Sequence, residues 1–256
     1  MKFATWNVNS LNVRLLHVLD WLAANKPEVL CLQETKLEDS KFPYDALIEV
    51  GYEAVHNGQK TYNGVAILSR LPLSEPIMGM SEFEDPQKRI ISASVGDTRV
   101  VCAYFPNGQA VGSEKYQYKL RWLEAFTQWL QAELVRYPKL VLLGDYNIAP
   151  EDRDVHDPKA WEGMVHVSEP EREAFRRLVG LGLYDAFRLF EQAEKSYSWW
   201  DYRMGAFRRN MGLRIDHILV SEPLRQYCMS CSIDVAPRKL ERPSDHTIVV
   251  LELSAT

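Results

Sequence analysis

The sequence predicts a mixed α/β fold in one domain over residues 1–256, and three observations support this prediction. Short apolar runs typical of buried strands recur along the chain, amphipathic helical segments stand between some of them, and no low-complexity linker divides them. A chain of 256 residues is long enough for one large sandwich domain. Hydrophobic residues make up 46% and charged residues 25%, as in water-soluble globular proteins.

The N-terminal part predicts a strand, a helix and a second strand. Residues 2–6 alternate apolar and polar side chains and stop at Asn7, which indicates a strand. Residues 11–24 carry apolar side chains at helical spacing. The apolar run 29–32 then leads to Glu34. Both expected strands therefore end at polar side chains.

The middle of the chain predicts strand after strand and then a long helix. Because turn-rich segments separate the expected strands, we expect an antiparallel meander. Its strands lie near residues 52–56, 64–69, 89–95 and 99–105. Residues 116–136 place large apolar side chains on one side of an amphipathic helix, and Pro138 closes it.

The next strand ends at a notable polar cluster. The run Leu140 to Leu143, which follows Lys139, is continuously apolar, as in a strand buried on both faces, and Gly144-Asp145-Tyr146-Asn147 ends it. Considered alone, this ending indicates a turn with Asp145 at its exposed end. Residues 152–167 are polar and loop-like, and a capping box at Ser168 begins a further helix that reaches about Leu181.

Polar side chains stand at the ends of three early strands and at the starts of two late strands, residues 213–220 and 244–253. They are Asn7, Glu34 and Asp145 in the early strands, and Asp216 and Asp245-His246 in the late ones. If the late strands run antiparallel to the early ones, all five clusters meet at one edge. Such a gathering predicts a site rather than five separate turns.

The residue types at this edge restrict the chemistry. Carboxylate and amide oxygens with few histidines favour Mg²⁺ or Mn²⁺ over zinc. The sequence also lacks a Walker loop and a Gly-x-Ser-x-Gly motif. Metal-assisted phosphoester hydrolysis fits these residues best.

Bulk properties exclude several other classes. The net charge of -5 argues against an extensively basic DNA-binding surface, so any polyanion site must be local or metal-assisted. Cys228 and Cys231 form a CxxC, but the further ligands of a zinc site and the context of a redox site are missing. No apolar run spans a membrane and no signal peptide is visible, so we expect a cytoplasmic protein.

Several segments resemble, in order and spacing, the exonuclease III family of DNA-repair nucleases, and the resemblance runs essentially end to end. These segments are Thr5-Trp6-Asn7-Val8-Asn9, Leu32-Gln33-Glu34-Thr35-Lys36, Gln87-Lys88-Arg89-Ile90-Ile91, Tyr104-Phe105-Pro106-Asn107, Gly144-Asp145-Tyr146-Asn147, Trp199-Trp200-Asp201-Tyr202-Arg203, Gly212-Leu213-Arg214-Ile215-Asp216 and Ser244-Asp245-His246. The resemblance implies a four-layer αββα sandwich of the DNase I-like type.

The resemblance also implies a metal site. By matching position, Glu34 corresponds to the principal Mg²⁺ ligand, with Asn7 and Asp245 nearby, and Mn²⁺ is an alternative cation. Asn9 stands where some relatives carry Asp, which would weaken a second metal position. Whether one or two metal ions act is left open by the sequence.

The catalytic roles follow in the same way. The resemblance implies that Asp145 orients or deprotonates the attacking water and that Asn147 stabilises the transition state. Asp216 corresponds to the carboxylate that pairs with His246, which contacts the scissile phosphate. Tyr104 corresponds to a tyrosine whose hydroxyl lies at that phosphate.

The segment 197–213 is the expected DNA-binding region. Arginines alternate there with aromatic residues, as in segments that hold a nucleic-acid backbone while bases stack. The alternative is a packed loop with a solvated basic face. The resemblance implies that Trp199 and Leu213 line a deoxyribose pocket. The other residues expected to contact DNA are Arg203, Arg208, Arg209, Asn210 and Arg214.

His166 departs from the family pattern. In the abasic-site endonucleases that align here, the position before the capping box is small, Gly or Ser. The imidazole of His166 would block a continuous strand while admitting a 3′ end, favouring 3′-phosphatase or exonuclease activity. The alternative is a loop histidine that faces solvent.

Together these patterns predict a Mg²⁺-dependent DNA-repair phosphodiesterase. We expect it to act as a monomer on double-stranded DNA with abasic sites or blocked 3′ ends, as a 3′-phosphatase, a 3′-to-5′ exonuclease and an abasic-site endonuclease in proportions left open. The alternatives are a phosphatase of the same fold that acts on a phosphoester outside nucleic acids, and a non-catalytic DNA-binding protein.

Overall fold

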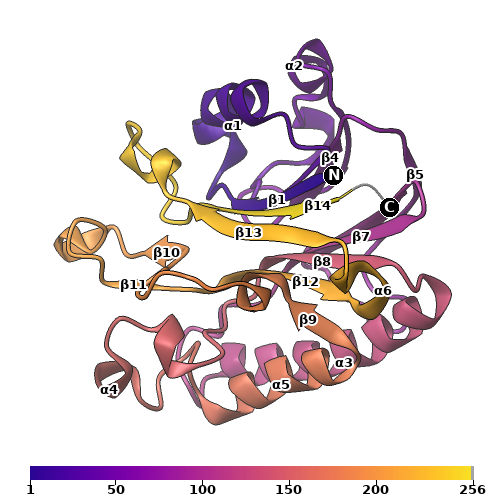
Figure 1. Cartoon of the computed structure of the whole chain (residues 1–256). Helices are drawn as coiled ribbons and strands as arrows, with labels where there is room; N and C mark the ends of the chain where they lie inside the picture. The colour runs from indigo at the N-terminus through magenta and orange to yellow at the C-terminus, as the bar shows by residue number, and fades with distance from the viewer. Residues whose placement is uncertain (255–256) are drawn as a thin grey trace.

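The computed structural model describes residues 1–254, and these form two six-stranded sheets packed face to face. Helices cover the outer face of each sheet, so the molecule has four layers in the order α, β, β, α (Figure 1). This confirms the four-layer sandwich that the family resemblance implied. The N-terminal strand lies beside the C-terminal one, because β1 pairs with β14.

The first sheet has the strand order β13-β14-β1-β2-β4-β3. Its strands are β1 (Lys2–Asn7), β2 (Val29–Gln33), β3 (Glu53–Asn57), β4 (Val65–Ser69), β13 (Cys228–Asp234) and β14 (Ile248–Leu253). The helices α1 (Leu11–Asn25) and α2 (Tyr44–Glu49) lie on its outer side (Figure 1).

The second sheet has the order β5-β6-β7-β8-β12-β9. Its strands are β5 (Leu73–Met78), β6 (Ile90–Val95), β7 (Thr98–Tyr104), β8 (Leu140–Asp145), β9 (Leu183–Asp185) and β12 (Asp216–Ser221). The long helix α3 (Glu114–Arg136) and the helix α5 (Glu169–Gly180) cover its outer side (Figure 1).

Short elements complete the chain. They are the hairpin of β10 (Trp199–Trp200) and β11 (Gly212–Leu213), the helices α4 (Pro158–Trp161) and α6 (Glu222–Arg225), and 3-10 turns at Asp39–Lys41, Asp152–Asp154, Ala186–Leu189, Arg203–Gly205 and Ala236–Lys239. Within residues 1–254, no helix is long and apolar enough to cross a membrane.

The strands that lead to the polar clusters are buried because both of their faces are covered. The inner faces of the two sheets form one apolar core that includes Phe3, Cys31 and Leu143. The outer faces pack against the helices in two further apolar clusters. The apolar residues 140–143 of β8 are all buried, as their continuous apolar pattern predicted.

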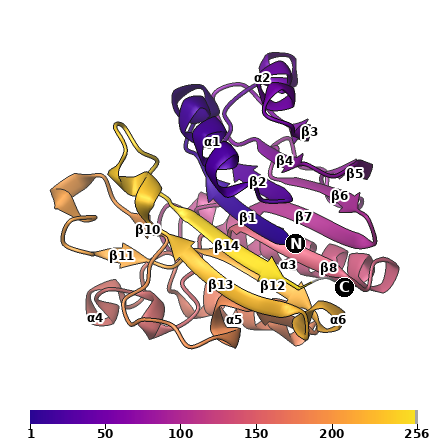
Figure 2. The same cartoon turned by 45° about the horizontal axis from the view of Figure 1, so that its top comes forward.

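Strand directions bring the polar clusters to one edge. The parallel pairs β1–β2 and β7–β8 end there, whereas β14 and β12 run antiparallel to β1 and β8 and begin there. Figure 2 shows the adjacent strands β13, β14 and β1 of the first sheet, with the β10–β11 hairpin beyond the end at which β14 begins. The late strands therefore run antiparallel to the early ones, as the predicted meeting of the five clusters at one edge required.

The predicted meander is divided between the two sheets. Strands β3 and β4 pair in the first sheet, whereas β5, β6 and β7 pair in the second. The sequence prediction did not identify β5, in which Pro76 and several exposed side chains interrupt the strand pattern. It also did not identify β13, an edge strand with one face partly exposed.

Gly144 brings β8 close to β7 just before Asp145. A Cβ atom at Gly144 would lie 1.8 Å from the carbonyl oxygen of Ala103, a backbone atom with no room to move. We therefore expect Gly144→Ala to lower the free energy of unfolding by about 4 kcal/mol.

Urea unfolding measures this effect, with Gly180→Ala as the matched control. A Cβ atom at Gly180, which ends α5, would meet no neighbouring group within 4 Å, so stability should stay equal or rise slightly. Equal stability of the two variants would contradict the crowding argument.

Candidate active site

Asp145 ends β8 inside the molecule, not at an exposed strand end as the sequence indicated. Its residue surface is 1% exposed, and the backbone N–H of Asn147 donates to its Oδ1 at 2.9 Å. Burial raises the pKa of Asp145 to about 7; the nearby charge of His246 lowers it, and that of Asp216 raises it. A carboxylate with a pKa near neutrality is suited to accept a proton.

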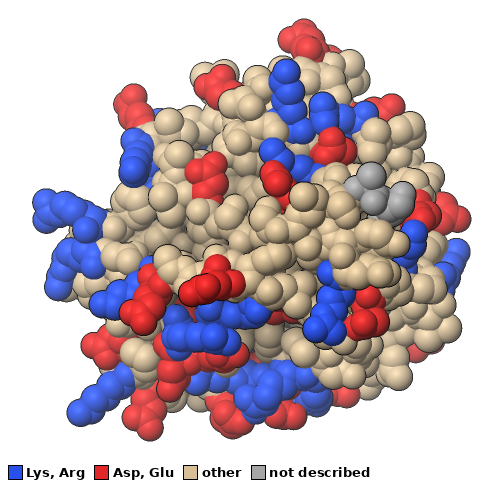
Figure 3. All heavy atoms as spheres, in the orientation of Figure 1, with Lys and Arg blue, Asp and Glu red and all other residues tan. Residues whose placement is uncertain are grey.

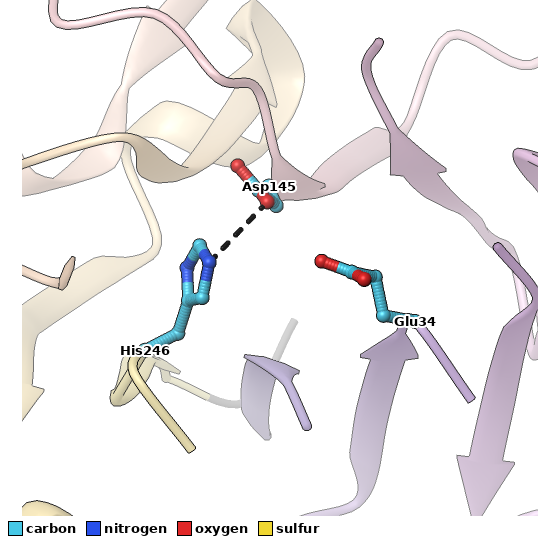
Figure 4. Close-up of side chains that lie close together, drawn as sticks. All are labelled: Glu34, Asp145 and His246. Carbon is cyan, nitrogen blue, oxygen red and sulfur yellow. Dashed lines mark ion pairs between the residues drawn. The ribbon is translucent and has the colours of Figure 1, made fainter. Parts of the chain in front are cut away.

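His246 connects Asp216 to Asp145. Its Nδ1 lies 2.9 Å from Asp216 Oδ2, and its Nε2 lies 3.7 Å from Asp145 Oδ2 (Figure 4). Burial opposes the charged imidazolium, but the carboxylates of Asp216 and Asp145 outweigh it and raise the pKa of His246 to about 10. His246 is therefore positively charged at neutral pH, with its ring between the carboxylates of Asp216 and Asp145.

Asn7 links the two sheets at this edge. Its Nδ2 donates to Glu34 Oε1 and to Asp145 Oδ2, both at 2.9 Å. The ligand atoms of Glu34, Asp145 and His246 all lie within 4.8 Å of one another (Figure 4). This spacing and the oxygen donors fit a divalent cation, whereas a protonated His246 has no lone pair for a metal.

Asp245 lies beside this group and has other partners. Asn9 Nδ2 donates to Asp245 Oδ1 at 3.0 Å, and Trp199 Nε1 donates to Asp245 Oδ2 at 3.0 Å. Lys36 bonds Asn9 Oδ1 at 2.6 Å and lies 3.2 Å from Glu34 Oε2. Lys36 was not predicted as a site residue, although it stands two residues after Glu34 in one of the family-like segments.

Tyr104 ends β7 and lines a cavity beside the group. Burial raises the pKa of its hydroxyl well above the ordinary value, with Glu34 adding to the effect, so the hydroxyl keeps its proton. The guanidinium of Arg89 lies 4.8 Å from its ring centre. The cavity measures about 580 Å³, and its lining includes Tyr62, Asn63, Gln87, Arg89, Tyr104, Asn107 and Lys115.

Asn147 follows Asp145 and adopts a left-handed backbone conformation, with φ 49°. Its Nδ2 donates to the carbonyl oxygen of Phe105 at 3.0 Å, and its Oδ1 accepts from Asn107 Nδ2 at 3.3 Å. Glu34 also has a positive φ, of 51°. Such strained residues cluster where the surrounding structure holds functional groups in place.

His166 is not a solvent-facing loop histidine, so that alternative is wrong. It is 6% exposed, and its Nδ1 donates to the carbonyl oxygen of Asn147 at 2.7 Å. Burial and the nearby charge of Lys119 lower the pKa of His166 to about 3, which leaves the ring neutral. The structure therefore places His166 directly against the loop of Asn147.

The hairpin of β10 and β11 stands next to the site. Trp199 pairs with Leu213, and the backbone of Trp199 also bridges to His246. Leu213 is fully buried, whereas Trp199 is partly exposed. At the left of Figure 3, lysine and arginine side chains gather where Figure 1 places the β10–β11 loop.

The expected DNA-contacting residues of this hairpin do not all reach its surface. Arg203, Arg209 and Asn210 are exposed. Arg214 is 2% exposed and forms buried ion pairs with Asp154 and Asp185, so its prediction as a DNA-contacting residue is wrong. The carboxylates that neutralise it lie far from it in the sequence, and no local pattern indicated them.

Comparison with known proteins agrees with this geometry. The exodeoxyribonuclease III of Haemophilus influenzae is 37% identical, covering 98% of this chain and 99% of its own. The 3′-5′ exonuclease NExo of Neisseria meningitidis is 47% identical with a TM-score of 0.98, and an AP endonuclease of Archaeoglobus fulgidus is 40% identical with a TM-score of 0.96. Both structures match over 100% of each chain.

A further structure of NExo from Neisseria, described as a 3′ phosphatase, was solved bound to a product DNA hairpin. It has the same 47% identity and TM-score of 0.98. The profile of the Endonuclease/Exonuclease/phosphatase family matches residues 4–246, a span that contains every strand-end cluster described above. Fold, edge geometry and sequence therefore agree, and this chain belongs to the Endonuclease/Exonuclease/phosphatase family.

Proposed function

We propose that this protein is a metal-dependent DNA-repair nuclease similar to exonuclease III, which removes phosphate groups and nucleotides from the 3′ ends of duplex DNA. The observation that carries the proposal is the convergence of Glu34, Asp145 and His246 within 4.8 Å, with Asn7 between the carboxylates. The relatives named as exonucleases and as a 3′ phosphatase support the substrate class.

Glu34, with Asn7 beside it, would hold Mg²⁺, or Mn²⁺ in its place. When bound, the cation neutralises charge on the phosphate oxygens. Asp245 remains a proposed neighbour of this position, although its carboxylate is engaged by Asn9 and Trp199.

Asp145 receives a proton from water as the new bond from the water oxygen to phosphorus forms. The bond from phosphorus to the leaving oxygen breaks at the same time, and that oxygen keeps the bonding electron pair and takes a proton from solvent water. The pKa of Asp145, near 7, suits this transfer at neutral pH.

Three further side chains stabilise charge on the phosphate. His246, kept positive by Asp216, faces the phosphate, and the protonated hydroxyl of Tyr104 donates a hydrogen bond to it. The side-chain amide of Asn147 supplies a donor that strengthens in the transition state. Outside this group, Trp199, Leu213, Arg203, Arg209 and Asn210 are the proposed contacts of the DNA.

The decisive assay compares three duplexes in the presence of Mg²⁺: one with a 3′-phosphate, one with an ordinary 3′-hydroxyl and one with an internal abasic site. We expect rapid phosphate release from the first and slower removal of nucleotides from the second. EDTA should abolish both activities, and added Mg²⁺ should restore them, because Glu34, with Asn7 beside it, offers the oxygen ligands that a divalent cation prefers.

The same assay tests the alternatives. Release of phosphate from an inositol lipid or of phosphocholine from sphingomyelin, with no cleavage of DNA, would replace the proposal by a phosphoester hydrolase of another substrate class. DNA binding without cleavage would indicate a non-catalytic protein. We also propose that the chain acts in the cytoplasm as a monomer with one domain, which sedimentation and limited proteolysis test.

A further inference from the structure

Lys119 is a buried charged residue that the proposed chemistry does not use. It lies near the start of α3, and its side chain and that of its ion-pair partner, Glu171 of α5, are both 0% exposed. Burying such a pair brings little net stability, because removing both charges from water costs about as much as their attraction returns. A role other than stability is therefore worth seeking.

The ammonium group of Lys119 is directed to the catalytic edge. Besides Glu171, its Nζ donates to the carbonyl oxygen of Asn147 at 2.7 Å and to that of Asn107 at 3.2 Å. A lysine ammonium has three donors, so these three acceptors use all of them. The two carbonyls belong to the loops that follow β8 and β7.

Glu171 binds the segment from His166 to Ser168, which precedes α5. Its carboxylate accepts hydrogen bonds from the backbone N–H groups of His166 at 3.0 Å and Ser168 at 3.2 Å, and from the Ser168 hydroxyl. His166 Nδ1 in turn donates to the Asn147 carbonyl oxygen. That single oxygen therefore accepts from Lys119 and from His166, and both donors depend on Glu171.

Several neighbours hold Asn147 in place. Its φ of 49° lies in the left-handed region, which asparagine enters more readily than most residues with side chains, so the hydrogen bonds around it rather than strain fix its position. Its side-chain amide donates to the carbonyl oxygen of Phe105, so neighbouring groups hold both the backbone and the side chain of Asn147. A small movement of a group that acts on a transition state can cost about 100-fold in rate.

We propose that Lys119 and Glu171 are positioning residues whose ion pair holds the Asn147 carbonyl, and through it the Asn147 amide, where charge develops on the phosphate. The same pair sets the place of His166 beside Asn147. This inference rests on the proposed role of Asn147 in phosphoester hydrolysis.

Steady-state kinetics on the duplex with a 3′-phosphate tests the proposal. Lys119→Met removes the donor, and the double variant Lys119→Met/Glu171→Gln does so without leaving an unpaired buried charge. We expect both to lower kcat by about 10- to 100-fold, with KM changed by less than about threefold.

Glu133→Gln is the matched control. Glu133 also lies on α3, fourteen residues after Lys119 or roughly 21 Å along the helix, and pairs with buried Arg99 away from the site. It should leave kcat within about twofold of the original value. An unchanged kcat in the folded double variant, or an equal loss in Glu133→Gln, would overturn the proposal.

A double-mutant cycle separates positioning from a general structural effect. If Lys119 acts through Asn147, then Lys119→Met should lower kcat little further in a chain that already carries Asn147→Ala. The same fold-loss in both backgrounds would show that Lys119 acts independently of Asn147 and would refute the proposed link.

Hydrogen exchange tests the link without relying on enzyme activity. Amides of residues 145–149 and 165–168 should exchange faster in the double variant, with no such change in Glu133→Gln. If the unmodified protein does not act on DNA, the proposed function fails while this measurement still decides whether the pair holds the loop. Unchanged exchange in both segments would overturn the holding role itself.

Discussion

Replacing Asp145 with asparagine is expected to lower kcat for 3′-phosphate removal by about 10³-fold, the range lost when a general base is removed. Asn147 and Asn7 both donate to the Asp145 carboxylate, and His246 faces it. An asparagine has nearly the same shape and keeps one oxygen, which can still accept from the Asn147 N–H, but it cannot accept a proton from water. The effect should therefore appear in kcat with the fold intact.

Circular dichroism and single-turnover kinetics on the same preparation measure both properties. Asp97→Asn is the control. Asp97 is an exposed aspartate on the turn between β6 and β7, and its ion-pair partner is Lys139. The control variant should retain full activity. A folded Asp145→Asn protein with more than about a tenth of the original kcat would remove Asp145 from the role of base.

Replacing His166 with serine is expected to raise cleavage at an internal abasic site by at least about tenfold, equal to about 1.4 kcal/mol of transition-state free energy. The imidazole is neutral and nearly buried against the loop of Asn147, with its ring centre 6.3 Å from that of Trp161. Serine removes this bulk beside the site, so a continuous strand gains a path. Removal of a 3′-phosphate should change by only a few-fold.

A second histidine beside Trp161 provides the control. The ring centre of His156 lies 6.4 Å from that of Trp161, but its Nδ1 lies near the carbonyl oxygen of Gly212 rather than that of Asn147. His156→Ser should therefore leave internal cleavage unchanged. Unchanged internal cleavage in a folded His166→Ser protein would show that this imidazole does not exclude a continuous strand.

The sequence was most informative where a local pattern reports burial. Strand β8 is buried along its whole length. Its run of apolar side chains has no polar face, so both faces of the strand must pack against other parts of the protein. The same run ends in Asp145, so the order of polar residues at strand ends was visible before any contact was known. Family-like segments then assigned a role to each of them.

Edge strands were harder to predict because their environment differs on the two faces. Strand β5 contains Pro76 and β13 has a register shift after Cys228, so neither shows a regular period. The division of the meander between two sheets also has no local signal. Which sheet a strand joins depends on the surfaces that it meets after the chain has folded.

By itself, the sequence determined the fold class, the order of the strand-end clusters and the types of donor atom that meet at the edge. Only the tertiary structure decided that Asp145 is buried with a pKa near 7, that Arg214 is neutralised inside the protein, and that His166 contacts the Asn147 carbonyl. The reason is physical: side-chain periodicity records how each segment is buried, whereas desolvation and charge pairing depend on neighbours that lie far away along the chain.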